Sequence, residues 1–284
     1  MSDITIINDS QQSELVTNGL AKNGELYLKA EGSTDAGAIV VYDSGAWRTF
    51  GNEAVAGFAN SYSVLTDGSN DYVACGTVAA LNSATNFSVS MWVNFQSFVA
   101  NGSGYNIFLG AGSHTGNRFL LNAVRNTNTS SNRLEVYYAE GSPSIVGTSL
   151  GLSTNTWYHM AAYKSGSNMS FYIDNSLMDS RTNAPTADSN AGSNFAIGRG
   201  IYNGAYSANM LVDEVAVWGS DQSSNRDSIY NSGVPGDISS LSPTHWWRMG
   251  DNDSGTGSTV TDQGSGGNNG TLTNGAAFST TVPS

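Results

Sequence analysis

The sequence has little charge and few strong helix-forming stretches. Asp, Glu, Lys and Arg make up 12% of the 284 residues, about half the usual share in soluble proteins. The surface must therefore consist mostly of Asn, Ser, Thr and Gly. Runs of Ala, Leu, Glu and Lys are few, whereas 33 glycines and many Asn/Ser turns separate short apolar stretches. This pattern favours strands over helices, and it predicts an all-β protein.

Basic residues are the scarcest charged type. Eleven Lys and Arg stand against 23 Asp and Glu, which gives a net charge of −12. Binding to nucleic acid requires clustered basic residues, and so does docking on an anionic membrane surface, so we expect neither partner. The opening "MSDITIINDSQQSELV" lacks the basic and apolar regions of a signal peptide, and no apolar run is long enough to span a bilayer. We expect a soluble protein made in the cytoplasm.

Cysteine and histidine offer little chemistry. The single cysteine, Cys75, has no partner for an internal disulfide and no Cys/His cluster around it for zinc. We expect it to be a buried strand residue. The histidines at positions 114, 159 and 245 have no Ser, Asp or Cys arrangement nearby in the sequence that marks a catalytic triad. His159 alternates within a strand pattern, which predicts a packing or hydrogen-bonding role.

Strand signals occur along the whole chain. Residues 1 to about 60 contain "GELYLKAEG" and "GAIVVYDSGAWRTF", which predict a small β module. From Tyr62 the strands become regular: "NFSVSMWVNF" alternates apolar and polar residues, and "NTWYHMAAYKSGSNMSFYIDN" predicts a hairpin. "SSNRDSIYNSG" is the one credible short helix. Many short antiparallel strands predict a sandwich or jelly roll.

Four segments carry a family resemblance. "LTDGSNDYVACG" (Leu65–Gly76), "FSVSMWVNF", "NTWYHMAAYKSGSNMSFYIDN" and "MLVDEVAVWG" follow one another in this order. Together they resemble laminin-G-like, concanavalin A-like jelly-roll domains over about Tyr62–Gly219. The resemblance implies an antiparallel jelly-roll sandwich.

The C-terminal segment Thr244–Ala277 stands in an unusual place. In the family, a segment like "WWRMGD…TVTDQGSGGNNGTLTNG" usually precedes the "DGSNDYV" strand, whereas here it follows the last strong strand. We therefore predict a permuted sandwich over residues 61–284, completed by strands within 244–277. The alternatives are that these strands complete a neighbouring subunit, or that they form a loose tail.

A second resemblance concerns residues 1–60. The stretch "LYLKAEGSTDAGAIVVYDSGAWRTFGNEA" is similar to short β modules at the head of structural proteins of marine and cyanobacterial phages. This implies a virion protein, built in the host cytoplasm and exposed on the particle as a fibre, tail or capsid-decorating component. Residues 1–60 would bind other virion proteins. A homo-oligomer, for instance a trimer, follows from this resemblance alone.

Catalysis is not expected. Glucan hydrolases with this sandwich need two carboxylates across a cleft. Asp213 and Glu214 are adjacent in "VDEVAVW", and neighbouring residues of a regular strand point to opposite faces. The glycine-rich "GSGGNNG" lacks the Lys-Ser/Thr and the helix of a phosphate-binding loop. We predict that the protein is not an enzyme.

Calcium is the one metal that the sequence suggests. Ca²⁺ is bound by carboxylate, amide and backbone oxygens. Laminin-G-like sandwiches often hold an ion at the rim, and the resemblance places the matching ligands at Asp213, Asp251, Asn268 and Asn269. The alternative is that Asp251 and Asp262 accept backbone hydrogen bonds within turns.

A glycan site would use loop aromatics and amides. The candidates are Tyr105, Tyr202, Asn203 and Tyr206, and the alternative is that these rings pack on the sandwich rim. The tryptophans at 92, 157, 218 and 246 lie within strand patterns and are assigned to core or inter-sheet packing. Three functions remain open: attachment to a host surface polysaccharide, decoration of the particle without a ligand, and polysaccharide degradation. A secreted bacterial adhesin is a weaker fourth, which the missing signal peptide disfavours.

Overall fold

The computed structural model divides the chain into two compact units, Met1–Ala59 and Asn60–Ser284. The sequence-based boundary stood at residue 60. The described residues are 5–7, 10, 26–29, 39–43, 46–50, 58–98, 105–112, 118–125, 132–138, 145–186, 189–200 and 206–284. Each unit is considered by itself.

The N-terminal unit contains one four-stranded sheet. Its strands follow the chain order: β1 (Thr5–Ile7), β2 (Leu26–Lys29), β3 (Ile39–Asp43) and β4 (Ala46–Phe50). β1 pairs parallel with β2, whereas the other pairs are antiparallel. Asp43 pairs with Ala46 where β3 is joined to β4.

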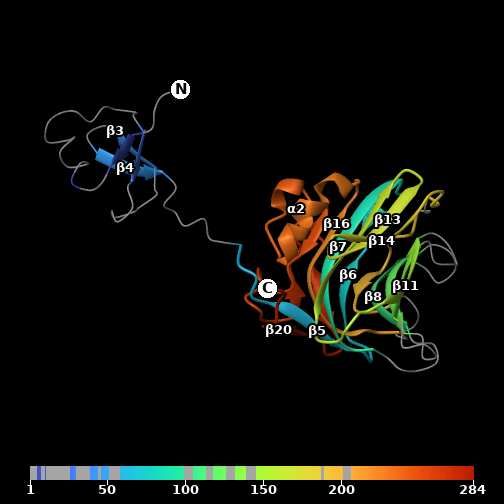
Figure 1. Ribbon diagram of the computed structural model, residues 1–284. Helices are drawn as coiled ribbons and strands as arrows, with labels where there is room; N and C mark the ends of the chain where they lie inside the picture. Colours follow the sequence, from blue (N-terminus) through green and yellow to red (C-terminus); the bar gives the residue numbers. More distant parts are fainter. Residues whose placement is uncertain are drawn as a thin grey trace. The chain divides into compact units, whose positions relative to one another are not determined.

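The second unit is a sandwich of two sheets (Figure 1), and the predicted jelly-roll class is confirmed. The first sheet has the order β11 (Ile145–Leu150), β10 (Asn132–Tyr138), β9 (Arg118–Arg125), β8 (Tyr105–Gly112), β15 (Phe195–Ile197), β6 (Tyr72–Gly76), β19 (Gly270–Thr273) and β18 (Thr259–Val260). The second has the order β14 (Ser176–Arg181), β13 (Asn168–Ile173), β12 (Trp157–Ser165), β7 (Asn86–Ser97), β16 (Asn209–Trp218), β5 (Ser63–Asp67) and β20 (Ala277–Ser279). β17 (His245–Trp247) pairs with the end of β16.

The core lies between the two sheets. On β7, the predicted inward face is confirmed: its five alternating apolar residues, Phe87, Val89, Met91, Val93 and Phe95, are at most 1% exposed and belong to the core. Cys75 on β6 is buried as predicted. The loop Gly166–Ser167 joins β12 to β13, and Ser165 pairs with Asn168, so the predicted hairpin is also confirmed.

The outer face of the second sheet is covered by short helical turns. These are η2 (Ser223–Asn225), α2 (Arg226–Tyr230; Figure 1), η3 (Asn231–Gly233) and η4 (Ser239–Leu241). The remaining turn, η1 (Ala79–Leu81), follows β6 in the chain. Trp92 stacks on Tyr230, and the Trp218 indole N–H donates to the Leu241 carbonyl. Trp92, Trp157, Trp218 and Trp246 were predicted to pack in the core or between the sheets. Trp92, Trp218 and Trp246 are buried but lie outside the inter-sheet cluster, and Trp157 is only half-buried; the cluster contains Trp247 instead.

The C-terminal segment contributes strands to both sheets of its own chain. β19 pairs with β6, and β20 pairs with β5. Trp247 is fully buried and its ring stacks on that of Phe195. Because Trp247 fills the space between the sheets, the segment is an integral part of the sandwich.

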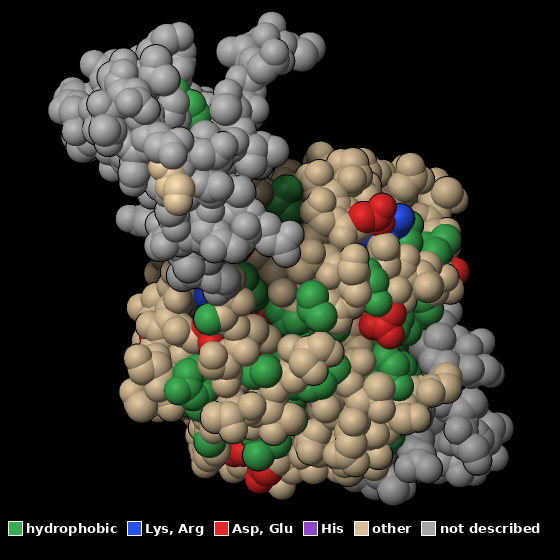
Figure 2. All heavy atoms as spheres, turned by 60° about the vertical axis from the view of Figure 1, so that its left-hand side comes forward, with side chains coloured by type: hydrophobic (Ala, Val, Ile, Leu, Met, Phe, Trp, Pro, Cys, Tyr) green, Lys and Arg blue, Asp and Glu red, His purple; other side chains and the backbone are tan. Residues whose placement is uncertain are grey.

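The surface reflects the low charge of the sequence. In Figure 2 the visible face is mostly uncharged polar side chains and backbone, with scattered apolar patches and few charged groups. Among the described residues, no helix has the length and apolarity needed to cross a membrane.

Candidate functional site

The structure joins three carboxyl groups at the middle of β16. Asp213 is opposite Trp92, whereas Ala216 is opposite Ser90, so two residues of β16 face one of β7. This is a β-bulge, and Glu214 occupies the left-handed region with φ +48°. The expectation that Asp213 and Glu214 point to opposite faces is therefore wrong, because the bulge interrupts the alternation. Carboxylate oxygens of Asp213, Glu214 and Asp251, the acidic cluster, lie within 4.8 Å of one another.

Arg248 holds the acidic cluster together. Its Nε donates to Glu214 Oε1 at 3.0 Å, and its Nη2 lies 3.4 Å from Asp251 Oδ2. The Trp246 indole N–H donates to the other Glu214 oxygen at 2.6 Å. These contacts fasten the segment after β17 to the bulge of β16.

Burial changes the protonation of the cluster. Desolvation raises the pKa of Glu214 to about 7, although Arg248 opposes the shift. Desolvation, followed by repulsion from Glu214, raises the pKa of Asp213 well above its ordinary value. Desolvation also raises the pKa of Asp251. The cluster therefore favours holding protons, which is how a low-dielectric site avoids several buried negative charges.

The residues of the cluster do not fit a calcium ion. Two of the three carboxyl groups already bind the Arg248 guanidinium, and each oxygen of Asp213 accepts a hydrogen bond, from Glu214 N–H and from the Asn60 amide. Ca²⁺ requires six to eight available oxygens. The positive charge that the cluster needs is supplied by the arginine.

Asn268 and Asn269, the other predicted ligands, belong to a different network. Asp262 accepts hydrogen bonds from His245 Nδ1 at 2.7 Å and from the backbone N–H groups of Trp246, Gly264 and Asn268 at 2.8 Å. The Asn269 side chain accepts from Asp262 N–H. The alternative role weighed for Asp262, as an acceptor of backbone hydrogen bonds in a turn, agrees with these contacts.

The glycines of this loop allow close packing. A Cβ atom on Gly266 would lie 2.1 Å from His245 Cε1, and one on Gly264 would lie 2.4 Å from the Thr244 carbonyl oxygen. The His245 ring also stacks on Trp247, with 5.2 Å between centroids. The run "GSGGNNG" thus lets the loop residues 262–269 pack directly on β17.

The other described histidine also forms a polar pair. Ser90 Oγ lies 2.8 Å from His159 Nε2. The sequence did not predict this contact, because the two residues are 69 positions apart in the chain. The pair is buried beneath α2, and desolvation lowers the pKa of His159 to about 3. His159 Nδ1 has no hydrogen-bond partner among the described groups, so no acid completes a triad. The predicted packing and hydrogen-bonding role fits this position.

A surface hollow lies on the outer face of the first sheet. Tyr72, Ala74 and Gly76 alternate on β6 with the core residues Val73 and Cys75, so they face outward. The hollow has a volume of about 280 Å³, close to the lower end of small-molecule sites. Its described lining is Tyr72, Ala74, Gly76, Gly112, Asn194, Phe195, Ala196, Arg199 and Gly200. We call it the β6–β15 hollow.

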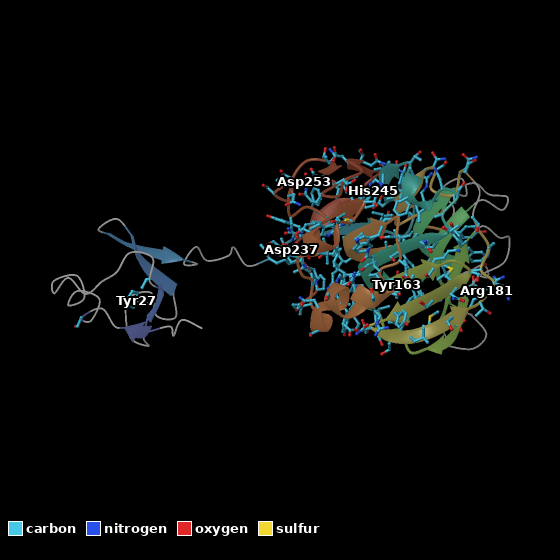
Figure 3. The ribbon with its side chains drawn as sticks, turned by 90° about the horizontal axis from the view of Figure 1, so that it is seen from above. Tyr27, Tyr163, Arg181, Asp237, His245 and Asp253 are labelled. Atoms are coloured by element: carbon cyan, nitrogen blue, oxygen red, sulfur yellow. The ribbon has the colours of Figure 1, made fainter. Side chains whose placement is uncertain are left out.

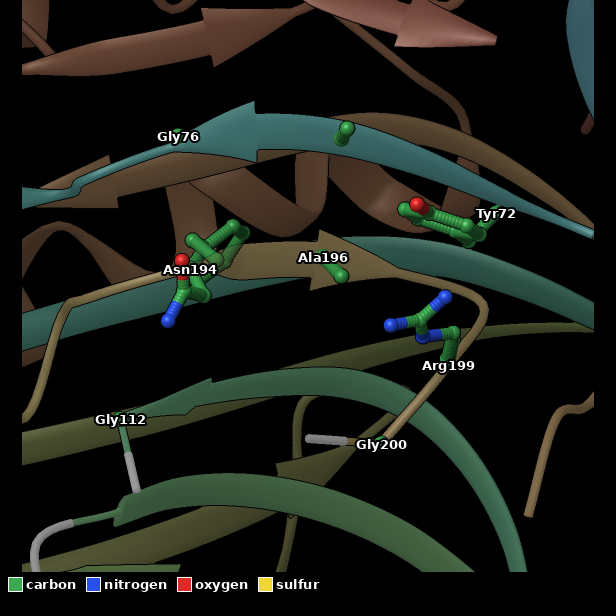
Figure 4. A pocket seen from close by; sticks show the side chains of 9 residues that line it. Tyr72, Gly76, Gly112, Asn194, Ala196, Arg199 and Gly200 are labelled. Atoms are coloured by element: carbon green, nitrogen blue, oxygen red, sulfur yellow. The ribbon is translucent and has the colours of Figure 1, made fainter. Parts of the chain in front are cut away.

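Small residues form the floor of the β6–β15 hollow, and polar side chains form its ends. Ala74 on β6 pairs with Ala196 on β15, which in turn pairs with Gly110 on β8. Figure 4 shows Asn194 at one end and Arg199 beside Tyr72 at the other. No carboxylate occurs among the lining residues that the structure describes.

The local backbone brings Arg199 to Tyr72. Gly198 follows β15 with φ +94°, a conformation that favours glycine, and its N–H donates to the Phe108 carbonyl. The chain therefore turns immediately after the strand. The Arg199 guanidinium carbon lies 4.1 Å from the centroid of the Tyr72 ring, which is a cation–π contact.

A second hollow lies on the outer face of the other sheet. It has about 240 Å³ and is lined by Ser, Thr and Asn residues together with Tyr163, Met169, Arg181 and Asp221. Figure 3 shows Tyr163 well separated from His245 and Asp253, which lie in the C-terminal segment. The buried Tyr163 hydroxyl has no hydrogen-bond partner there.

The predicted loop aromatics are only partly placed. Tyr206 is 37% exposed with φ +73°, and its carbonyl accepts from Ile107 N–H. Tyr105 begins β8. Tyr202 and Asn203 lie outside the described residues. Sequence analysis missed Tyr72, Asn194 and Arg199. The signal that could have indicated them is the alternation of small residues in "YVACG" and "NFAIGRG", two segments whose strands pair in the structure.

The geometry defines an antiparallel β-sandwich with small hollows on the outer faces of its sheets. Residues 67–226, more than half of the chain, match the Laminin_G_3 family, described as the concanavalin A-like lectin/glucanases superfamily. The protein belongs to this superfamily.

The chain is similar to solved structures at low sequence identity. A putative carbohydrate-binding protein from Bacteroides ovatus is 19% identical, with a TM-score of 0.58 over 91% of this chain and 70% of that one. A heptameric SAP-like pentraxin from Limulus polyphemus is 15% identical, with a TM-score of 0.49 over 62% of this chain and 84% of that one. No curated protein sequence matches the chain.

Proposed function

We propose that the protein binds carbohydrate in the β6–β15 hollow. The observation that carries the proposal is the hollow itself: an open floor of small residues on a lectin-type sandwich, with polar groups at both ends. Asn194 is exposed and offers an amide donor and acceptor, while Tyr72 and Arg199 offer a ring edge and N–H donors. Sugar sites need such donors and acceptors around an apolar floor.

A glycan array tests this proposal. The full chain, labelled at a surface amine, is applied to defined oligosaccharides beside the Tyr72→Ala variant. The variant loses one wall of the hollow and the ring that supports Arg199, so we expect apparent affinity to fall at least tenfold, which corresponds to about 1.4 kcal/mol.

Tyr172→Ala is the matched control. Tyr172, on β13 in the other sheet, also lies beneath an arginine, since the Arg226 guanidinium is 4.7 Å from its ring centroid. We expect this variant to bind as the unmodified protein does. Equal losses of apparent affinity in the Tyr72→Ala and Tyr172→Ala variants would refute the proposed site. If the unmodified protein binds no glycan on the array, the proposed function is refuted.

We propose binding without hydrolysis. The β6–β15 hollow has no described carboxylate, and Asp213 and Glu214 of the acidic cluster are at most 5% exposed. A glycosidase needs two carboxyl groups that reach the sugar from either side. Release of reducing ends from a polysaccharide that the protein binds would overturn this proposal.

We further propose that the protein is displayed on a phage particle, as a fibre, tail or decoration component. The support is the resemblance of Leu26–Ala54 to phage modules, together with the separate compact unit Met1–Ala59. Many copies, arranged as a homo-oligomer such as a trimer, would compensate for weak binding at each site. An image of particles in which the chain can be traced tests the location, and light scattering of the purified protein tests the subunit number.

A further inference from the structure

The guanidinium of Arg199 lacks the polar partners that the guanidinium groups of Arg248 and Arg226 have. Arg248 binds two carboxylates, and Arg226 donates to Asn175 and Asp227. Arg199 makes no hydrogen bond or ion pair with any described group. Its one contact of this kind is the Tyr72 ring, which attracts the positive charge but accepts no hydrogen bond in the guanidinium plane.

One nitrogen of Arg199 is both buried and unpaired. Nε is shielded from solvent and has no hydrogen-bond partner. Buried N–H donors are nearly always satisfied in proteins, so an unpaired one requires an explanation, such as an acceptor brought by a ligand. Figure 4 places this guanidinium beside Tyr72, at the end of the hollow beyond Ala196. Ala74, which pairs with Ala196, completes the floor.

The chemistry of this donor selects a particular acceptor. A guanidinium presents adjacent N–H groups in one plane, which match the two oxygens of a carboxylate. A sugar hydroxyl would satisfy one donor and leave the charge uncompensated. No described residue that lines the hollow is acidic, so none of the lining side chains repels a ligand carboxylate.

The whole-chain charge limits the number of charges on the ligand. With a net charge of −12, the protein repels densely charged polymers such as heavily sulfated glycans. One cationic group in the hollow matches one carboxylate per bound sugar. Resting on the proposed carbohydrate-binding function, we infer that the β6–β15 hollow binds a saccharide bearing a carboxylate, of the uronic acid class, with Arg199 as the group that recognises it.

Matched pairs of ligands test this inference. Trigalacturonate and the oligosaccharide obtained by reducing its carboxyl groups differ only at the recognised group, and a sulfated galactan oligosaccharide serves as the alternative anion. Affinities are measured by titration calorimetry at two NaCl concentrations. For the full-length protein, we expect trigalacturonate to bind about tenfold more tightly than its reduced counterpart, with the difference shrinking at high salt.

Two variants assign the effect. Arg199→Gln should bind the native and reduced oligosaccharides equally, at the weaker affinity. Arg226→Gln removes the same charge from helix α2, which lies on the outer face of the other sheet, and should keep the tenfold preference. Circular dichroism of each variant verifies that the sandwich remains folded.

The other outcomes contradict either the carboxylate inference alone or that inference together with the proposed function. Equal binding of native and reduced oligosaccharides by the unmodified protein overturns the carboxylate inference and leaves the proposed function intact. Preference for the sulfated ligand overturns it as well. If none of these ligands binds while neutral array glycans do, the inference again fails alone. If no glycan of any kind binds, the proposed function and the inference fail together.

Discussion

Replacing Glu214 by glutamine should remove a pH dependence from the stability of the sandwich. Desolvation raises the pKa of Glu214 to about 7 from an ordinary value of 4.5. The folded state therefore binds this proton more tightly than the unfolded chain does. The resulting stabilisation is fully present below pH 4.5 and is lost as the pH rises through about 7.

The magnitude follows from the shift. At 1.36 kcal/mol for each pKa unit, the rise from 4.5 to about 7 contributes about 3 kcal/mol to the free energy of unfolding. Glutamine carries no proton to lose, and its carbonyl still accepts from the Trp246 indole. The difference in stability between the unmodified protein and Glu214→Gln should thus change by about 2–3 kcal/mol between pH 5 and pH 8, in favour of the variant at high pH, since part of the effect falls below pH 5.

Chemical unfolding of the full chain at several pH values, followed by near-UV circular dichroism, measures this difference. Asp67→Asn is the control, because Asp67 is exposed and backbone hydrogen bonds, chiefly from Ser69, lower its pKa. Its contribution is lost only as the pH falls below about 4, so its slope from pH 5 to pH 8 should match that of the unmodified protein. A Glu214→Gln difference that is independent of pH would show that the carboxyl group is not buried at the bulge.

Three further predictions concern the C-terminal segment and the acidic cluster. Asp262→Asn should destabilise the protein by about 3 kcal/mol in chemical unfolding, because the amide NH2 that replaces one buried oxygen cannot accept from His245 or from the Asn268 N–H, and the buried negative charge is lost; a loss under 1 kcal/mol would contradict the network. Gly266→Ala should cost about 2 kcal/mol through its clash with His245, whereas Gly151→Ala, with open space around it, should be neutral. Excess Ca²⁺ should leave the Tm unchanged relative to EDTA, because Arg248 already neutralises the cluster; a rise of several degrees would contradict this.

The regular parts of the fold were predictable from the sequence. Strict alternation, as in Phe87 to Phe95 on β7, predicts a half-buried strand, and the structure places these residues in the core. The same alternation could not show that the outer face of β7 is covered too. Trp92 on that face packs against Tyr230, a contact between positions far apart in the chain that periodicity does not reveal.

The acidic cluster could be predicted only in part. Asp213 and Asp251 were expected to lie together, and they do. Glu214 was placed on the wrong face, because a β-bulge with φ +48° at a glutamate has no local sequence signal. Asn268 and Asn269 were grouped with these acids, whereas the Asp262 loop holds them.

The β6–β15 hollow was not predicted, because it exists where small residues leave space open rather than where large side chains gather. Aromatic residues draw attention in a sequence, whereas Ala74 and Ala196 appear as ordinary strand residues. Tyr72 and Arg199 come together only when β6 pairs with β15 and Gly198 turns the chain. Such a site depends on strand order, which the local pattern does not encode.

The central claim, that the β6–β15 hollow binds sugar, is tested most directly by a crystal structure of the full chain with the oligosaccharide that binds best on the array. We predict a sugar ring over Ala74 and Ala196, within hydrogen-bond distance of Arg199 and Asn194. A sugar bound in the second hollow beside Tyr163, or at Tyr206 away from β6, would contradict the account.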